Sequence, residues 1–491
     1  MHTDPATPTT TLTLDPGHWH DTRALAHRIV DDLIDHVDQV RESPPWTRPT
    51  AAARALFAEP LPTRGASLDR IYDDVRTHVM PHTLGVVHPR FWGWVNGSGT
   101  MGGALADFIA AALNGHVAFG DQAPLLMERQ VIRWFTTLFG LPEDATGLLV
   151  SSASVANLTA LTVARDTALP HTLGPGLGTS GLIPRVYASA EVHNCIEKAL
   201  GILGLGRDAL HHVPCDDTFT ISIPALRAAI QRDRAAGCTP IAIVAAAGTV
   251  NTGAVDDIGT LADVAREEGL WLHVDAAFGA AVAASGTHGH LLRGIDRADS
   301  VAFDLHKWFH VPYDAACCLI RNGEAHRRSF TVSAGYLGML EGGIPSVPHP
   351  FGDLGPDLSR SFRALKVWMS LREHGMDTFG ALVDQNIEQA RLLAQRVRDT
   401  PSLELVATGP LHIVCFRHVP PGLSPDALDA HNRAIVARLH DDGIAVPSFA
   451  RIRGAFAIRV CINNHRTNCD DLDLLVASVC RIGDALADRR S

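Results

Sequence analysis

Between residues 147 and 320 the chain alternates short apolar runs with helical stretches, and this alternation limits the possible folds more than any other feature. Six runs have the length of a buried strand, at 185–188, 209–213, 240–246, 271–275, 300–303 and 315–320. Stretches with helical spacing, such as 223–235 and 258–268, separate most of them. The pattern predicts an α/β fold with a mostly parallel central sheet and helices on both faces. Ligands of such sheets bind at the carboxyl ends of the strands.

The segments on either side of this region predict three parts in the whole chain. Residues 1–85 carry two amphipathic helices without a core of their own, so we expect an N-terminal helical arm that packs on a partner subunit. Residues 86–376 form the large domain. Residues 377–491 alternate strands and helices, with one helix near 425–441, and form a small C-terminal α+β domain. Just before this domain, a helix is expected at 358–373.

Composition and charge exclude several classes of protein. Hydrophobic residues make up 46% of the chain and charged residues 19%, as in a globular protein. The formal net charge is −11 without a long basic run, which argues against nucleic acid or an anionic membrane as a partner. No apolar run reaches about 18 residues and no secretory signal is evident, so a cytoplasmic enzyme is expected. The 26 histidines and nine cysteines show no metal-ligand spacing, and no metal is predicted.

Lys307 is the first candidate for chemistry. It follows the apolar run 300–303 and stands between His306 and Trp308. Desolvation disfavours the ammonium form, so a lysine with such neighbours can serve as a nucleophilic amine. The alternative is a lysine that extends its charged end to solvent.

Two further sites lie in the same region. Asp275 ends the apolar run WLHVD, and a buried carboxylate there requires a cation, such as the protonated nitrogen of a pyridine ring. The turn 151–154, SSAS, joins a strand to a helix N-terminus and suits a phosphate group. A structural salt bridge and an ordinary helix cap are the respective alternatives. Together, a phosphate anchor, a ring-nitrogen partner and an amine are the three parts that pyridoxal phosphate needs.

Four segments resemble the group II pyridoxal-phosphate-dependent amino-acid decarboxylases, with aromatic-L-amino-acid decarboxylase as the nearest type. They are SSASVANLTAL at 151–161, HVDAAFGA at 273–280, ADSVAFDLHKWF at 298–309 and SFRALKVWMSL at 361–371. The resemblance covers roughly residues 20–485. It implies the aspartate-aminotransferase-like fold, called fold type I, and a homodimer with shared active sites. It also makes 86–376 the cofactor-binding domain.

The resemblance implies a role for several residues toward pyridoxal 5'-phosphate. Lys307 would hold the cofactor as an imine, Asp275 would face the ring nitrogen, and His193 would stack on the ring. The remaining expected contacts are phosphate binding by Ala153 and Ser154, and cofactor contacts by Thr249, Ala277 and His306. Two positions depart from some relatives, since Asp304 replaces an asparagine and Val155 replaces a glutamate.

The family's loop between the lysine and the SFRALK segment carries a tyrosine that reprotonates the reacting carbon. In this chain no tyrosine occurs between Leu337 and Arg360. A gapless comparison places Phe351 at the tyrosine position, and Tyr336 is the nearest phenol. Two outcomes follow. Tyr336, His193 or water could supply the proton and give an amine, or the unprotonated carbon could react with oxygen and give an aldehyde and ammonia.

By resemblance, the substrate pocket would contain Trp92, Trp94, Asn96, His116 and Phe119. This set has no arginine or lysine to hold a side-chain carboxylate, which favours an aromatic substrate. The predicted activity is decarboxylation of an aromatic L-amino acid to the amine and carbon dioxide. The alternatives are oxidative deamination to an aldehyde, another lyase, aldolase or transaminase activity, and a cofactor-binding protein without turnover.

Overall fold

The structure is a computed structural model that describes residues 12–332 and 349–489. The chain divides into two compact units, one of residues 1–43 and 47–83 and one of residues 44–46 and 84–491. Tyr336, one of the predicted catalytic residues, lies outside the described residues.

The first unit is helical, as the spacing of its apolar residues predicts. Its three α-helices are α1 (Trp19–Asp38), α2 (Ala51–Leu56) and α3 (Leu68–His78). Two polar contacts join α1 to α3. The Tyr72 hydroxyl donates to Asp32 at 2.7 Å, and the Arg28 guanidinium lies 3.2 Å from Asp69. Packing of this unit on a partner subunit stays a prediction.

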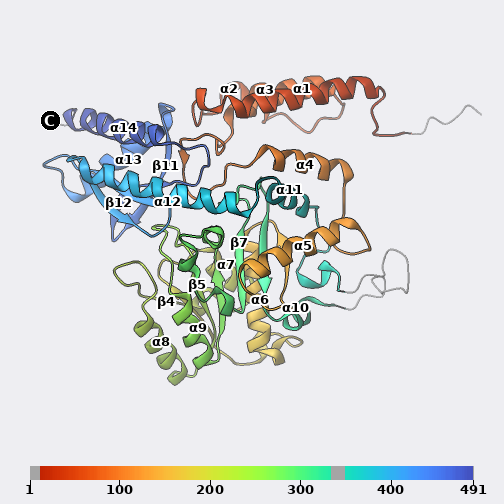
Figure 1. The fold of residues 1–491 in the computed structure, drawn as a ribbon, viewed down its shortest axis with the longest axis vertical. Helices are drawn as coiled ribbons and strands as arrows, with labels where there is room; N and C mark the ends of the chain where they lie inside the picture. Colours follow the sequence, from red (N-terminus) through yellow and green to blue (C-terminus); the bar gives the residue numbers. More distant parts are fainter. Residues whose placement is uncertain (1–11, 333–348, 490–491) are drawn as a thin grey trace, which may run out of the picture. The chain divides into compact units, whose positions relative to one another are not determined.

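A seven-stranded sheet forms the centre of the second unit (Figure 1). Its strands are β2 (Thr146–Val150), β3 (Pro184–Ser189), β4 (Leu210–Val213), β5 (Thr239–Ala246), β6 (Trp271–Asp275), β7 (Ser300–Asp304) and β8 (Ala316–Ile320). The order is β2-β8-β7-β6-β5-β3-β4, and β8 alone runs antiparallel to its neighbours. Every residue of β6, β7 and β8 is buried, which explains their continuous apolar sequence. The predicted α/β class is confirmed.

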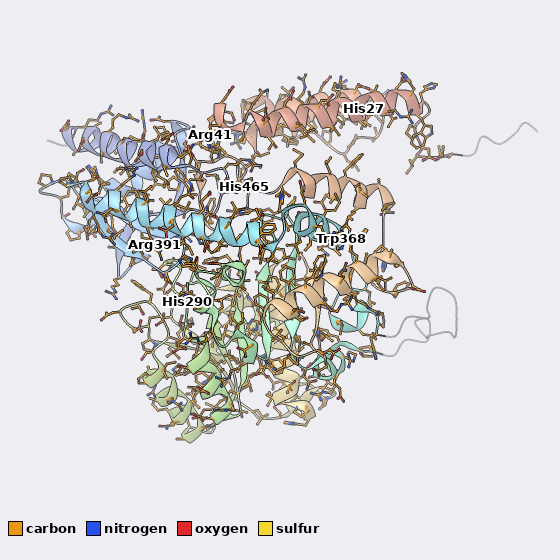
Figure 2. All side chains as sticks on the ribbon, in the orientation of Figure 1. His27, Arg41, His290, Trp368, Arg391 and His465 are labelled. Carbon is orange, nitrogen blue, oxygen red and sulfur yellow. The ribbon has the colours of Figure 1, made fainter. Side chains whose placement is uncertain are left out.

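Helices cover this sheet and set the position of its loops. They are α4 (Met101–Leu113), α5 (Ala123–Leu138), α6 (Ala153–Ala168), α7 (Cys195–Ile202), α8 (Ile223–Ala235), α9 (Ile258–Glu268), α10 (Gly323–Phe330) and α11 (Ala364–His374). Helix α6 begins directly after the turn that follows β2 and packs on β5 to β8. Helix α11 packs on α5, where the Trp368 indole N–H donates to Gln130 at 2.9 Å (Figure 2).

A second, five-stranded sheet has its own apolar core. Its strands are β1 (Phe91–Trp92), β9 (Leu403–Thr408), β10 (Ile413–His418), β11 (Val446–Ile452) and β12 (Ala455–Cys461), with helices α12 (Met376–Asp399), α13 (Pro425–Asp441) and α14 (Cys469–Asp488). Strand β1 pairs in parallel with β11, with Phe91 opposite Val446. A segment that the sequence assigned to the large domain therefore completes the C-terminal sheet. The boundary at residue 376 stays a prediction.

The helix predicted from Leu358 begins only at Ala364. Arg360 explains the difference, because its backbone carbonyl accepts the Val117 N–H at 2.9 Å and cannot close a helical turn. Its buried guanidinium donates to the Leu149 carbonyl at 2.8 Å and pairs with Glu128. This pair fixes the end of β2, from which the turn into α6 starts.

Within residues 12–332 and 349–489, no helix combines the length and the apolar character that a membrane crossing requires. The same ranges contain no group of three or more histidine, cysteine, aspartate or glutamate side chains that could hold a metal ion.

Candidate active site

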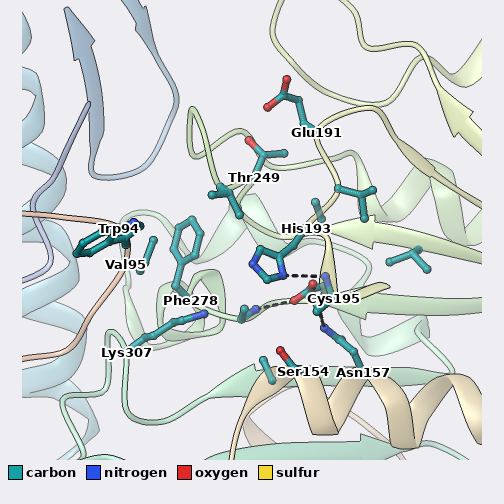
Figure 3. Close-up of a pocket in the computed structure, with 18 residues that line it drawn as sticks. Trp94, Val95, Ser154, Asn157, Glu191, His193, Cys195, Thr249, Phe278 and Lys307 are labelled. Carbon is teal, nitrogen blue, oxygen red and sulfur yellow. Dashed lines mark hydrogen bonds between the residues drawn. The ribbon is translucent and has the colours of Figure 1, made fainter. Parts of the chain in front are cut away.

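A cavity of about 240 Å³ lies at the carboxyl ends of β5, β6 and β7 (Figure 3). Asp275 is the last residue of β6, and Lys307 follows the end of β7 by three residues. The cavity thus lies where parallel sheets usually bind ligands. The sequence-predicted residues that line it are Trp94, Ala153, Ser154, His193, Thr249, Asp275, Ala277 and Lys307.

Lys307 supplies the only lysine amine at this cavity. The sequence has three lysines, and the other two, Lys198 and Lys366, do not line it. Lys366 pairs instead with Asp107 at 3.1 Å. The Lys307 side chain is 22% exposed and its Nζ lies 2.7 Å from an Asp304 carboxylate oxygen. An amine in this position can react with a bound carbonyl compound.

The two neighbours of Lys307 do not enclose its amine, although the sequence suggested that they would. The Trp308 ring is 1% exposed and lies 3.7 Å from the His412 ring, in the core. The His306 ring lies 4.1 Å from the Tyr313 ring and does not line the cavity. Its side chain packs on Tyr313, and its contact with the cofactor stays a prediction.

Asp304 connects the lysine to the N-terminus of α6. Its buried carboxylate accepts the Ala153 N–H at 2.5 Å and pairs with Lys307. The Ala153 N–H, predicted to bind phosphate, is therefore engaged by a side chain. The N–H of Ser154 lies in the first turn of the helix and has no acceptor within it. It remains suited to an anion.

Asp275 is a buried carboxylate that faces the cavity. One oxygen accepts the Ala277 N–H at 3.1 Å, and the other accepts the Asn157 side-chain amide at 3.1 Å. Burial raises the pKa of Asp275, whereas the nearby Lys307 and His193 lower it. A cation placed beside Asp275 would offset the cost of burying its charge.

His193 lies in the turn after β3, and its side chain lines the cavity (Figure 3). Its Nδ1 accepts the Cys195 N–H at 3.2 Å, so the neutral ring carries its proton on Nε2. Burial lowers the pKa of His193, and Asp275 raises it. The Thr249 hydroxyl accepts the Ala254 N–H at 3.1 Å and is thus engaged within its own turn.

Phe351 does not lie at the cavity. It begins the 3-10 helix Phe351–Leu354, its side chain is 4% exposed, and the Arg360 guanidinium stacks 4.9 Å from its ring centroid. Its ring is therefore enclosed by its own chain. Apolar packing and Arg360 hold it in the core of its own chain, and its predicted role at the tyrosine position stays a prediction.

Of the five predicted substrate-binding residues, only Trp94 lines the cavity. Trp92 is 1% exposed and belongs to the core of the second sheet, so its predicted role is wrong. Asn96 accepts the hydroxyl of a tyrosine at 2.6 Å, and the rings of His116 and Phe119 lie 5.1 Å apart, away from the cavity. A substrate role for these three residues stays a prediction.

The structure adds cavity residues that the sequence reasoning missed, among them Asn157, Glu191 and Cys195. Asn157 could have been found, because it follows Ala153 by four residues and so shares its face of the helix. Glu191 and Cys195 flank His193 at a spacing of two, in a turn whose shape the sequence does not reveal.

Gly97 provides a test of how the lysine loop is held. Its N–H donates to the His306 carbonyl at 3.1 Å, and a Cβ here would lie 2.2 Å from the Lys307 carbonyl oxygen. Gly97→Ala must therefore displace one backbone segment. We expect it to destabilise the protein by about 1–3 kcal/mol and to weaken cofactor binding. Thermal unfolding and cofactor titration measure both. Unchanged values in both would contradict this packing, and Gly174→Ala, where a Cβ meets nothing within 4 Å, is the control.

Comparison with protein families gives a match to the pyridoxal-dependent decarboxylase conserved domain over residues 49–419. The chain belongs to this family. It is a pyridoxal-phosphate-dependent carboxy-lyase that acts on an amino acid.

Among curated relatives, aromatic-L-amino-acid decarboxylase of Bacillus atrophaeus is 33% identical, with 92% of this chain and 93% of the relative covered. Cysteine sulfinic acid decarboxylase of Homo sapiens is 30% identical, with 94% and 96% covered. Phenylacetaldehyde synthase of Arabidopsis thaliana is 27% identical, with 91% and 93% covered. The names of these relatives differ in both substrate and product.

Among solved structures, Oryza sativa TDC with PLP and tryptamine superposes with a TM-score of 0.89 at 24% identity, covering 96% of this chain and 100% of that one. This likeness, together with the mostly parallel sheet, confirms fold type I.

The residues at the cavity fit pyridoxal phosphate. Asp275 is a buried carboxylate, and among the described residues no cation is permanently paired with it. A protonated pyridine nitrogen would supply that cation. The N–H of Ser154, in the first turn of α6, suits the phosphate, and Lys307 supplies the amine. The assignment of these three roles is a proposal.

Proposed function

We propose that the protein decarboxylates an aromatic L-amino acid to the amine and carbon dioxide. The main support for this proposal is the set of residues that line the cavity. They include Trp94, Phe278 and Val250. Among residues 12–332 and 349–489, the lining contains no arginine and no lysine other than Lys307. Glu191 adds a negative charge to the lining. A substrate with an anionic side chain would meet repulsion there and no counter-ion. Similarity to the Bacillus atrophaeus enzyme supports the aromatic class.

The proposed roles follow from the contacts of each side chain. When bound, pyridoxal phosphate supplies a ring that accepts electrons from the bond to the departing carboxylate. Lys307 holds the cofactor, and Asp304, 2.7 Å from its Nζ, can receive the ammonium group once the substrate amine takes its place. Asp275 holds a proton on the ring nitrogen by its negative charge. Ser154 holds the phosphate.

We assign the final protonation to His193. Its ring lies at the cavity, and the hydrogen bond from the Cys195 N–H leaves the proton on the other nitrogen, Nε2. With His193 as the proton donor, the expected product is the amine, although one relative is named for aldehyde synthesis. Family membership favours decarboxylation over the transaminase, aldolase and non-catalytic alternatives.

A homodimer forms part of the same proposal. Helix α4 exposes four large apolar side chains, Leu105, Phe108, Ile109 and Leu113, which are between 40% and 65% exposed. A patch of this kind on a protein surface usually marks an interface between proteins.

Sedimentation of the protein should show a dimer, and Phe108→Glu should shift the equilibrium toward the monomer. A wild-type monomer at all concentrations would contradict the proposal.

The substrate class is tested with a panel of L-amino acids and the purified holoenzyme. We expect kcat/KM for tryptophan, tyrosine, phenylalanine or dihydroxyphenylalanine to exceed that for glutamate, aspartate or cysteine sulfinate by about a hundredfold or more, the scale of a few kcal/mol in selectivity. A matched variant, Glu191→Gln, removes the negative charge at nearly constant shape and should narrow this ratio. Preference for an acidic substrate would overturn the aromatic assignment.

A further inference from the structure

A network of buried polar side chains, which reaches the cavity at Asn157, leads to Asp275. Trp271, His273 and Asp275 are alternate residues of β6, so they share one face of the sheet. Ser300 pairs with His273 in the register of β6 and β7, and Asn157 comes from α6. His273, Ser300 and Asn157 are each 0% exposed.

The donors and acceptors of this network allow only one arrangement of its hydrogen bonds. The Trp271 indole is a donor only, and it donates to the Ser300 hydroxyl oxygen at 2.7 Å. The serine hydroxyl can then donate to His273 Nδ1 at 2.8 Å, and His273 Nε2–H donates to the Asn157 carbonyl oxygen at 2.7 Å.

The last step of the network reaches Asp275. With its oxygen engaged by the histidine, Asn157 must direct its amide NH₂ toward Asp275, and the distance to the carboxylate oxygen is 3.1 Å. An ionised carboxylate is an acceptor only, which completes the sequence of donors. Burial lowers the pKa of His273 to about 3, so the ring stays neutral and the direction does not change with pH.

We propose that Asn157 is a positioning residue for the cofactor, and that Trp271, Ser300 and His273 orient it to do so. Through the Asn157 amide, this hydrogen-bond network keeps Asp275 ionised and directs its carboxylate toward the ring nitrogen of pyridoxal phosphate. The inference rests on the role proposed above for Asp275, but on neither the substrate nor the product.

The position of Asn157 strengthens the inference. It lies four residues after Ala153 and three after Ser154, so one rigid helix carries the phosphate-binding turn and the group that aligns the ring-nitrogen partner. Helix α6 thereby sets the distance between the two ends of the cofactor site. Asn157 also donates to the Cys195 sulfur at 3.2 Å, which fixes its side chain further.

The test compares two cofactors in the full-length protein. One is pyridoxal 5'-phosphate, and the other is its 1-deaza analogue, in which carbon replaces the ring nitrogen. Asn157→Leu keeps the volume of the side chain and removes the amide. We expect it to weaken pyridoxal phosphate binding about tenfold, the scale of one hydrogen bond to a charged group. Binding of the analogue, which has no ring nitrogen for Asp275 to meet, should stay within about twofold of wild type.

Matched variants separate positioning from packing. Thr159→Val is equally buried on α6 and removes a hydrogen bond to the Val155 carbonyl, outside the network, so it should leave both affinities unchanged. His273→Gln can still accept from Ser300 and donate to Asn157, and should bind nearly as wild type. His273→Leu cannot, and should behave as Asn157→Leu.

Each outcome decides a separate point. Equal weakening of both cofactors by Asn157→Leu would mean a structural role and would overturn the inference, as would identical behaviour of the glutamine and leucine variants at position 273. Asp275→Asn serves as the reference. If it fails to discriminate between the two cofactors, the role of Asp275 itself is wrong. If it discriminates and Asn157→Leu does not, only the inference fails.

Discussion

Lys307→Ala is expected to abolish turnover and the visible absorption of the bound cofactor. Lys307 is the only lysine that lines the cavity, so no other residue can replace its amine. Loss of this group should lower kcat by at least about 10⁴-fold, since it removes both the covalent anchor and a proton-transfer group.

Reduction of the holoenzyme with borohydride, followed by peptide mass mapping, checks the same residue. The reduced cofactor should be found on Lys307 and not on Lys198 or Lys366. Lys366→Ala is the control, because it removes a buried lysine that does not line the cavity and pairs with Asp107 at 3.1 Å. Label on another lysine, or full activity of Lys307→Ala, would contradict the assignment.

Asp275→Asn is expected to lower kcat by more than about 10³-fold, while the cofactor still attaches to Lys307. The amide has nearly the same shape as the carboxylate but carries no charge to hold a proton on the ring nitrogen. The pH dependence of the cofactor spectrum should therefore change as well.

Asp299→Asn is the control for this charge change. Asp299 lies at the opposite end of β7 and accepts the Leu272 N–H at 2.7 Å, far along the strands from the cavity. Its replacement should alter stability and leave the cofactor spectrum unchanged. Equal effects of the two variants would show that Asp275 acts only through folding.

Most of the α/β layout could be predicted from the sequence, because buried parallel strands produce continuous apolar runs of strand length. β6 begins and ends as predicted, and so do the helices α8, α9 and α13. The sequence did not predict β1, because a strand of two residues is too short to show a periodic pattern. It did not predict β11 either. The start of α11 was misplaced because the contacts of Arg360 lie far away in sequence.

The sequence predicted the site residues that lie at the ends of buried strands. Asp275 and Lys307 both come at or just after the end of an apolar run, and together they match the ring-nitrogen partner and the amine that pyridoxal phosphate needs. Trp92 and Trp94 show the limit, since neighbouring aromatic residues of one segment divide between the core and the cavity. Asn157 lay in a quoted motif, but its partners come from two other elements. The homodimer and the cytoplasmic location stay predictions.

The central claim is that an aromatic L-amino acid loses its carboxylate and keeps its nitrogen. The most direct measurement is the product balance of the holoenzyme with such a substrate, reading carbon dioxide, amine, aldehyde, ammonia and hydrogen peroxide in one incubation. The predicted result is carbon dioxide and amine in equal amounts, without ammonia or peroxide. Carbon dioxide accompanied by aldehyde, ammonia and peroxide, or no carbon dioxide from any aromatic amino acid, would contradict it.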